Sequence, residues 1–288
     1  MASLRDIKTR IGSVKATQQI TSAMQMVASI KLQQAERKIT RYLPYKDNIT
    51  KLLDNFLSSE TKFKSAFEEV REINRVAVVV FSANMSLCGA FNANATRKLL
   101  RTIKEYKHLG DENILIYTIG KKTDQAIRKM DIKPKEYNES VAQNPDYVEM
   151  SEITSRLMQL FLNKEIDKVE IIYHQYRSKG VQMLVQETLL PISFEAPSNE
   201  TEQFPTEYII EPNREALLNS LVPKVIKTKM YSALLESYTS EQAARNMAMQ
   251  TATDNADDML DDLSLQYNKS RQQSITNELL DIIGATFK

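Results

Sequence analysis

Residues 224–283 read KVIKTKMYSALLESYTSEQAARNMAMQTATDNADDMLDDLSLQYNKSRQQSITNELLDII and contain neither glycine nor proline. In a helix interior Gly costs about 1 kcal/mol relative to Ala, and Pro costs about 3 kcal/mol. Residues 13–43, near the other end of the chain, also lack both residues. At 1.5 Å per residue, residues 224–283 alone would span about 90 Å as a helix. The sequence therefore predicts two very long helices at opposite ends of the chain.

Apolar residues recur at helical spacing in both segments. Long helices gain most of their stability by packing an apolar face, so we expect the two helices to pair as an antiparallel coiled coil. In the N-terminal segment the spacing of the apolar positions changes part of the way along the helix, as an inserted stutter would produce. These positions are Leu4, Ile7, Ile11 and Val14, followed by Ile20, Met24 and Val27; in the C-terminal segment they run from Leu217 to Leu263.

Prolines and glycines set the expected limits of these helices. Pro44 predicts a kink in the first helix, and Pro223 predicts a break or kink near the start of the second. Pro212 and Asn213 are typical start signals for the second helix, and Gly284 is a typical stop signal.

The middle of the chain has a different pattern, in which short β-branched runs alternate with amphipathic segments. This alternation is typical of a small α/β layer with a largely parallel sheet. The fold class we predict is mixed: a long antiparallel coiled coil plus a small Rossmann-like α/β domain, with units at 1–58, 72–195 and 208–288. Expected strands are 76–81, 114–119, 169–173 and 181–190, with a turn at 177–180; expected helices are 92–107, 123–130 and 149–163.

The charge of the chain is nearly balanced overall but unevenly spread. Residues 1–50 carry nine basic against three acidic residues, a net charge of +6, and residues 236–265 carry one basic against seven acidic residues, a net charge of −6. We interpret this as pairing between the two ends rather than as a nucleic-acid arm. A single cysteine, Cys88, excludes an internal disulfide. No apolar signal core or membrane-length apolar run is present, so we expect a chain in a reducing compartment.

The sequence motifs considered for nucleotide binding and for catalysis are all incomplete. A dinucleotide fingerprint needs three glycines after the first strand, and only Gly89 is present. Gly120-Lys-Lys-Thr123 resembles the end of a phosphate-binding loop, but its earlier Gly would fall at Leu115. The spacing along the sequence does not indicate that Cys88 lies near His108 or His174, either of which would be needed as a base. We therefore favour a buried structural thiol.

Acidic and methionine-rich positions in the C-terminal helix also have a structural interpretation. The five aspartates spread over more than one helix face, which favours a solvated face or a contact with basic residues over a metal site. The methionines favour core packing. We therefore expect no catalytic residue, no cofactor and no metal. The aspartates are Asp254, Asp257, Asp258, Asp261 and Asp262, and the methionines are Met247, Met249 and Met259.

Three segments carry a family resemblance. They are residues 4–31, which include LRDIKTRIGSV and QITSAMQMVA; residues 87–92, LCGAFN; and residues 240–256, SEQAARNMAMQTATDNA, followed by YNKSRQQSITNE at 267–278. The chain closely resembles, from end to end, the gamma subunits of F-type ATP synthases in their bacterial form.

This resemblance implies a rotor shaft that binds no nucleotide. The paired helices would stand inside a ring of three alpha and three beta subunits. The α/β domain would rest with epsilon on the membrane ring of c subunits, at the cytoplasmic face of the bacterial inner membrane. Proton flow would turn the shaft and drive ATP synthesis, or hydrolysis in reverse. No nucleic acid is implied as a partner, and the chain would be peripheral to the membrane.

Residues can be carried over only where the motifs match. Arg271 and Gln272 match positions that meet a loop of a beta subunit, and Thr276 belongs to the same contact region. Met24 matches a methionine that faces the lever region of beta. The tip, about 282–288, would lie in an apolar sleeve near the top of the ring.

Two departures from the family pattern affect specific segments. The usual Asp-Arg-Gly before Leu-Cys-Gly is Asn84-Met85-Ser86 here. Only two residues separate Asp281 from Gly284, where the family has three, so the tip contact is expected to be shortened or shifted.

Two other functions are compatible with helices plus an α/β layer. A coiled-coil adaptor unrelated to energy conversion would form a homodimer or bind a different partner. An α/β enzyme with a helical oligomerisation arm would bind a ligand in its middle domain.

Overall fold

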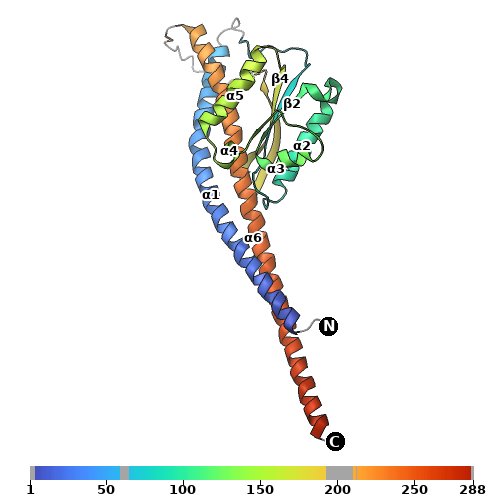
Figure 1. Ribbon diagram of the computed structural model, residues 1–288. Helices are drawn as coiled ribbons and strands as arrows, with labels where there is room; N and C mark the ends of the chain where they lie inside the picture. The colour runs from blue at the N-terminus through green and yellow to red at the C-terminus, as the bar shows by residue number, and fades with distance from the viewer. Residues whose placement is uncertain (1–3, 59–64, 193–209, 212, 287–288) are drawn as a thin grey trace.

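The computed structural model describes residues 4–58, 65–192, 210–211 and 213–286. Two long helices, α1 (Leu4–Ser58) and α6 (Arg214–Thr286), run antiparallel and side by side, and an α/β head lies against one end of the pair (Figure 1). At the other end α6 continues alone beyond the start of α1. The predicted fold class is confirmed. The expected segment limits at residues 1, 195, 208 and 288 lie outside the described residues.

The contact face of α1 repeats without interruption. Its buried and half-buried positions alternate in steps of three and four, which is the 3.5-residue period of a left-handed coiled coil. The expected stutter is wrong, because Ile20 and Val27 point to solvent and polar residues occupy the seam at that level. The seam positions are Leu4, Ile7, Ile11, Val14, Gln18, Thr21, Gln25, Ala28, Leu32, Ala35 and Ile39.

Both long helices pass through their prolines. Of the break or kink expected at Pro223, the break is wrong, since α6 begins at Arg214 and continues without interruption; α1 likewise continues past Pro44, where only a kink was expected. A proline leaves the carbonyl four residues earlier without its helical donor. Those residues, Asn219 and Thr40, are exposed, so water can satisfy the carbonyls.

The two ends of α6 differ in how well the sequence predicted them. The start is confirmed: Oδ1 of Asn213 accepts a hydrogen bond from the amide of Ala216 at 2.8 Å, as an N-cap does. The expected stop at Gly284 is wrong, because the helix continues to Thr286.

The head contains a five-stranded sheet in the order β3-β2-β1-β4-β5. The three pairings among β3, β2, β1 and β4 are parallel, and β5 is antiparallel to β4. This confirms the predicted largely parallel sheet. The strands are β1 (Val76–Phe81), β2 (Ile114–Ile119), β3 (Glu136–Asn138), β4 (Lys168–Ser178) and β5 (Val181–Leu190).

Several elements of the head were missed or misplaced by the sequence analysis. Strand β3 and the short helix α4 (Ser140–Gln143) were not expected, because neither has a periodic apolar run. Strand β4 extends five residues past the expected end at 173. Helix α5 (Tyr147–Leu162) begins two residues early, where the carboxylate of Asp146 accepts from the amides of Val148 and Glu149.

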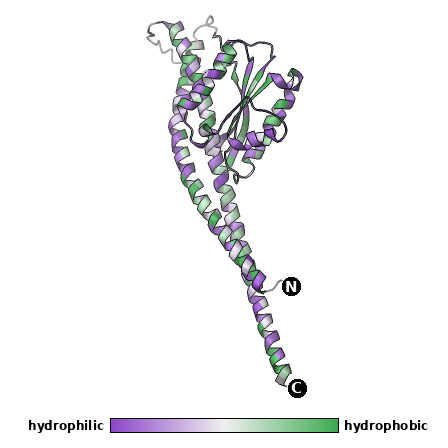
Figure 2. Cartoon of the chain, in the orientation of Figure 1, coloured by the Kyte–Doolittle hydropathy of each residue, from purple (hydrophilic) through white to green (hydrophobic). Residues whose placement is uncertain are grey.

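The two faces of the sheet pack against different layers. Helices α2 (Phe91–Glu105) and α3 (Lys121–Arg128) cover one face, where Val78 contacts Leu99 and Ile127 in one apolar cluster. Helices α5 and α6 cover the other face, and the cluster there includes Val79 and Leu234. Alternate residues of β1 therefore serve two cores, which explains its unbroken apolar run. Figure 2 shows the apolar strands inside the head and mixed colours along the shaft.

Candidate interaction surfaces of the shaft

Helix α6 fills the place where α/β folds of this kind usually take ligands. Ligands bind outside the carboxyl ends of the strands, at the point where the chain connections reverse direction. Here that point lies between β1 and β4. The hydroxyl of Ser240 on α6 donates to the carbonyl of His174 at 3.0 Å, and Ala244 packs on Cys88 and Phe91. The head thus uses this site to hold the shaft.

The loop after β1 is held in place by side chains from several elements. Asn84 accepts from the amide of Lys121 at 3.0 Å and donates to the carbonyl of Glu139 at 2.9 Å. Asn92 bonds the amide of Ala83 at 2.9 Å and the carbonyl of Met85 at 3.3 Å. The unusual Asn84 therefore joins this loop to the ends of β2 and β3.

Gly120 has a steric role in the same region. Its φ is +105°, and a Cβ there would lie 2.0 Å from the carbonyl oxygen of Ser82. Only glycine allows so close an approach of the ends of β1 and β2. Packing therefore explains the glycine of the weak phosphate-loop resemblance.

A buried ion pair joins the loop to α6. Arg245 bonds Glu241 at 2.6 Å, and both side chains are largely buried. Arg245 also donates to the carbonyl of Ser86. Burial raises the pKa of Glu241, and the charge of Arg245 opposes that rise. The guanidinium thus connects the shaft to the loop while compensating a buried carboxylate.

Cys88 and His174 lie closer together than sequence spacing indicated, since both pack around Phe91. They do not form a nucleophile–base pair. Cys88 Sγ bonds Met85 and Asn92, and burial raises the pKa of the thiol. His174 stacks on Phe91 with ring centroids 4.1 Å apart, and neither of its ring nitrogens has a hydrogen-bond partner. Its pKa is lowered to about 4 by burial. These residues are packing groups.

Below the head, polar side chains replace apolar ones in the seam. Thr253 donates to Thr21 at 2.9 Å, and Asn246 donates to the backbone carbonyl of Gln25 at 3.1 Å. Gln25 also donates to Gln250. Polar groups in a coiled-coil core favour one arrangement at a cost in stability. We call Thr21, Gln25, Asn246, Gln250 and Thr253 the polar seam.

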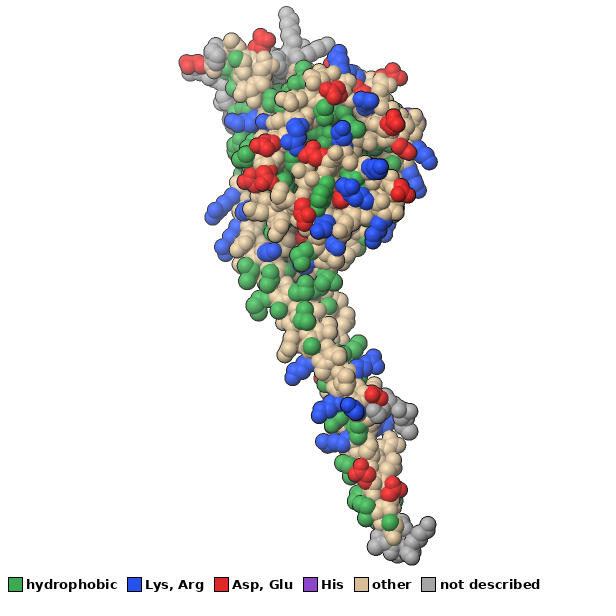
Figure 3. Space-filling model, viewed as in Figure 1, with side chains coloured by type: hydrophobic (Ala, Val, Ile, Leu, Met, Phe, Trp, Pro, Cys, Tyr) green, Lys and Arg blue, Asp and Glu red, His purple; other side chains and the backbone are tan. Residues whose placement is uncertain are grey.

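Beside the polar seam, α1 exposes a set of apolar side chains. Ile20, Met26, Val27 and Ile30 are between 55% and 66% exposed. Full burial of a side chain of this size is worth about 1.5–3 kcal/mol, so this surface has unused binding capacity. Figure 3 shows apolar side chains gathered on the shaft directly below the head. We call these four residues the apolar stripe.

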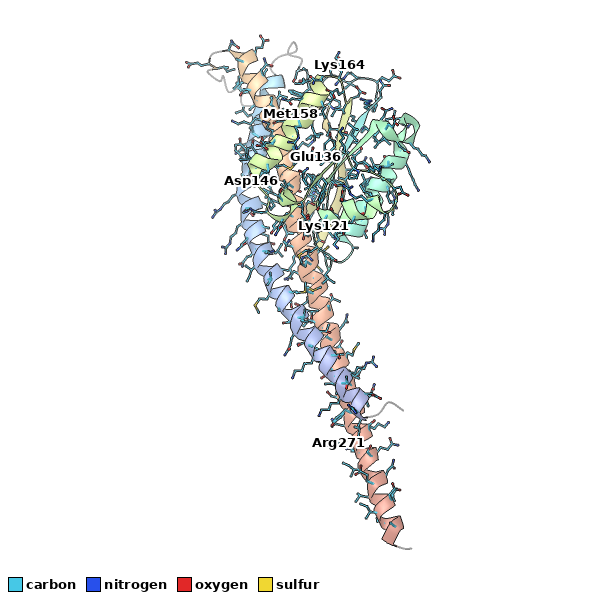
Figure 4. The ribbon with its side chains drawn as sticks, viewed as in Figure 1. Lys121, Glu136, Asp146, Met158, Lys164 and Arg271 are labelled. Atoms are coloured by element: carbon cyan, nitrogen blue, oxygen red, sulfur yellow. The ribbon has the colours of Figure 1, made fainter. Side chains whose placement is uncertain are left out.

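The predicted contact residues fall on two separate levels of the shaft. Met24 is half-buried on α1, next to the apolar stripe. Arg271 points away from α6 just beyond the start of α1 (Figure 4), and Gln272 and Thr276 are exposed nearby. Gln250, which bonds the neighbour of Met24, Gln25, is 21 residues before Arg271, or roughly 30 Å along the helix. The structure therefore does not bring the four residues together.

The projecting part of α6 exposes a second set of apolar residues, of which only 282 and 283 belong to the tip that was expected to lie in an apolar sleeve. Exposed apolar patches of this kind mark interaction surfaces. Arg271 and Gln272 lie at the base of this segment. The exposed apolar residues are Ile275, Leu279, Leu280, Ile282 and Ile283. Residues 287–288 of the expected tip lie outside the described residues.

The acidic run on α6 faces solvent, since Asp254, Asp257, Asp258, Asp261 and Asp262 are all exposed. In the part of the chain that the structure describes, no group of three or more His, Cys, Asp or Glu side chains could hold a metal ion. None of the described helices is both long and apolar enough to cross a bilayer.

These features define a class of protein: a long two-helix shaft with an α/β head packed against one end and two exposed apolar surfaces along its length. The comparisons specify the family. A family model described as ATP synthase matches residues 3–286. The chain belongs to the gamma chains of ATP synthases, which are non-catalytic central-stalk subunits.

Relatives and solved structures agree with this family. The ATP synthase gamma chain of Bacteroides thetaiotaomicron is 48% identical, covering 100% of both chains, and one from Bacteroides fragilis is 49% identical, covering 99% of both. The fold resembles a chain in a Euglena gracilis mitochondrial ATP synthase structure, with a TM-score of 0.67, 20% identity and coverage of 99% and 93%. A Tetrahymena thermophila central stalk and c-ring structure matches with a TM-score of 0.60, 19% identity and coverage of 81% and 99%.

Proposed function

We propose that this chain couples proton flow through a membrane ring to ATP synthesis and hydrolysis, by turning inside a ring of three alpha and three beta subunits. The observation that carries the proposal is the projecting end of α6, which continues alone beyond the start of α1 and exposes a broad apolar face. Such a segment needs an apolar enclosure. A ring that surrounds the helix would supply one.

The two surfaces of the shaft have different chemistry. Arg271 and Gln272 offer directional donors at the base of the projecting helix, where they would meet a loop of a beta subunit, and Thr276 lies one turn further along. Met24 and the apolar stripe offer soft contacts nearer the head, where they would meet the lever region of beta. Catalytic states shift only if the shaft makes contacts of different energy at different angles. Two asymmetric surfaces provide such differences.

The remaining partners are those that the resemblance to gamma subunits implies. The head lies at the opposite end from the projecting tip, so epsilon and the c ring would bind there, at the cytoplasmic face of the bacterial inner membrane. Membership of the gamma-chain family disfavours an unrelated coiled-coil adaptor. A ligand-binding α/β enzyme is disfavoured because α6 fills the usual ligand crevice.

Substitution of Arg271 tests the proposal in the assembled alpha–beta–gamma complex. Arg271→Ala should lower ATP turnover about tenfold, as loss of one charged contact of about 1.4 kcal/mol in the transition state would. Lys269→Ala is the matched control, because Lys269 is also an exposed cation on this part of α6. The fold of the isolated chain should be unchanged in both variants. Normal turnover in an assembled Arg271→Ala complex would overturn the assignment.

A further inference from the structure

Helix α1 has two faces that could pack on α6 between residues 18 and 30. The face in contact carries Gln18, Thr21 and Gln25, whereas the neighbouring face carries Ile20, Met24 and Val27. The two faces are one residue apart, which corresponds to a rotation of about 100° around the helix axis. Burial of apolar area alone favours the second face. The structure nevertheless adopts the first.

The polar seam distinguishes the two rotations. In the observed one, Thr253 and Asn246 donate across to α1, and Gln25 donates back to Gln250. In the rotated one, these bonds break and Ala28, which is 1% exposed, turns toward solvent. Hydrogen bonds require particular distances and angles, while apolar contacts tolerate many arrangements. Between residues 18 and 30 the hydrogen bonds therefore select the observed rotation, which is also the one that keeps apolar seam positions on either side, such as Ile7 and Leu32, buried.

We propose that the polar seam is an orientation lock, which keeps α1 turned so that Ile20, Val27 and Ile30 remain available to the surrounding ring. The polar residues are the positioning residues, and the apolar stripe is the surface that they position. The occupant of the stripe, an apolar surface of the alpha–beta ring, rests on the proposed function. The lock itself is a property of the chain alone.

Cysteine labelling of the full-length chain tests the lock. Val27→Cys should react quickly with a maleimide, and the neighbouring Ala28→Cys should react slowly, because Ala28 is buried in the seam. The parent chain measures the background from buried Cys88. Thr21→Ala combined with Gln25→Ala removes the lock. Thr17→Ala combined with Ser29→Ala is the matched control, since both residues are exposed on the same helix.

Without the lock, Val27→Cys should slow and Ala28→Cys should accelerate, each by about tenfold, which corresponds to a change of about 100-fold in the equilibrium between rotations, from roughly 10:1 to roughly 1:10. The control pair should leave both rates unchanged. Unchanged rates in the lock-free chain overturn the proposal. Acceleration at both positions indicates local unfolding and also overturns it. None of these results depends on ring binding, which the Arg271 experiment tests separately.

Discussion

The upper and lower parts of α6 share one continuous helical backbone and have opposite surroundings. Between Leu218 and Asn246 most side chains are buried, including polar ones such as Thr239 and Ser240. Beyond Leu263 almost every side chain is exposed, including Leu265 and Leu280. The upper part is stabilised within the chain, by the sheet, α5 and α1. The described part of the chain buries few side chains of the lower part, so under the proposed function their burial would come from the surrounding ring.

The same substitution, leucine to alanine, should affect stability very differently in the two parts of α6. Leu234→Ala removes a buried side chain from the core shared by the sheet and α6. It should lower the free energy of unfolding by about 4 kcal/mol, through lost burial and the cavity left behind. Leu280→Ala, on the exposed part, should change it by less than about 0.5 kcal/mol. Urea denaturation of the two variants measures the difference, and equal losses would contradict the division.

The stability of the upper part should depend on pH, because His174 lies buried where the head contacts α6. The histidine titrates near pH 6.5 when unfolded, and burial lowers its native pKa to about 4. Between these values the unfolded chain binds a proton that the folded chain does not, so stability falls as the pH drops from 6.5 to 4. The loss attributable to His174 should be on the order of 3 kcal/mol.

The measurement is the free energy of unfolding at several pH values, for the parent and for His174→Phe. Phenylalanine keeps a ring against Phe91 but does not titrate, so the variant should lack this part of the pH dependence. The same slope in both chains would exclude His174 as its source.

The pair of Arg245 and Glu241 tests whether the upper part depends on a compensated charge. Arg245→Ala leaves a buried carboxylate without its partner and should cost about 3 kcal/mol. The pKa of Glu241, already raised by burial, should rise further. The variant should therefore lose stability as pH increases through that pKa, because the folded state disfavours the charged carboxylate.

Glu241→Gln in the same background is the control for this pair. It should restore part of the stability and remove the added pH dependence. A double-mutant cycle showing no interaction between the two positions would mean that the ion pair does not stabilise the attachment of the head.

Hydrogen exchange measures the free energy of local opening at individual amides, which should differ between the two parts of α6. Amides of 225–246 should exchange only through global unfolding, while amides of 267–286 should open with almost no free-energy cost in the isolated chain. Assembly with alpha and beta subunits should protect the second group selectively. Strong protection of 267–286 in the isolated chain would show that the projecting helix is stable without a ring.

Sequence reasoning succeeded where one local signal dominated. The absence of Gly and Pro predicted both long helices, and the β-branched run at 76–81 predicted a strand buried on both faces. It failed where polar residues occupied a core. Gln18, Thr21 and Gln25 lie in the seam, whereas apolar periodicity had predicted Ile20 and Val27 there. A break or kink was also expected at Pro223, and the helix continues there, because the residue four positions earlier, Asn219, is exposed and water can satisfy its carbonyl.

Local sequence pattern was sufficient to predict the long helices, the parallel sheet and, through its motifs, the gamma-chain family, because these depend on backbone preference and short-range spacing. The face of α1 that meets α6, and the packing of α6 in the crevice of the head, became clear from the three-dimensional contacts alone. Both depend on hydrogen bonds and packing between residues more than 60 positions apart, such as Thr21 with Thr253 and His174 with Ser240. Local periodicity carries no information about such pairs.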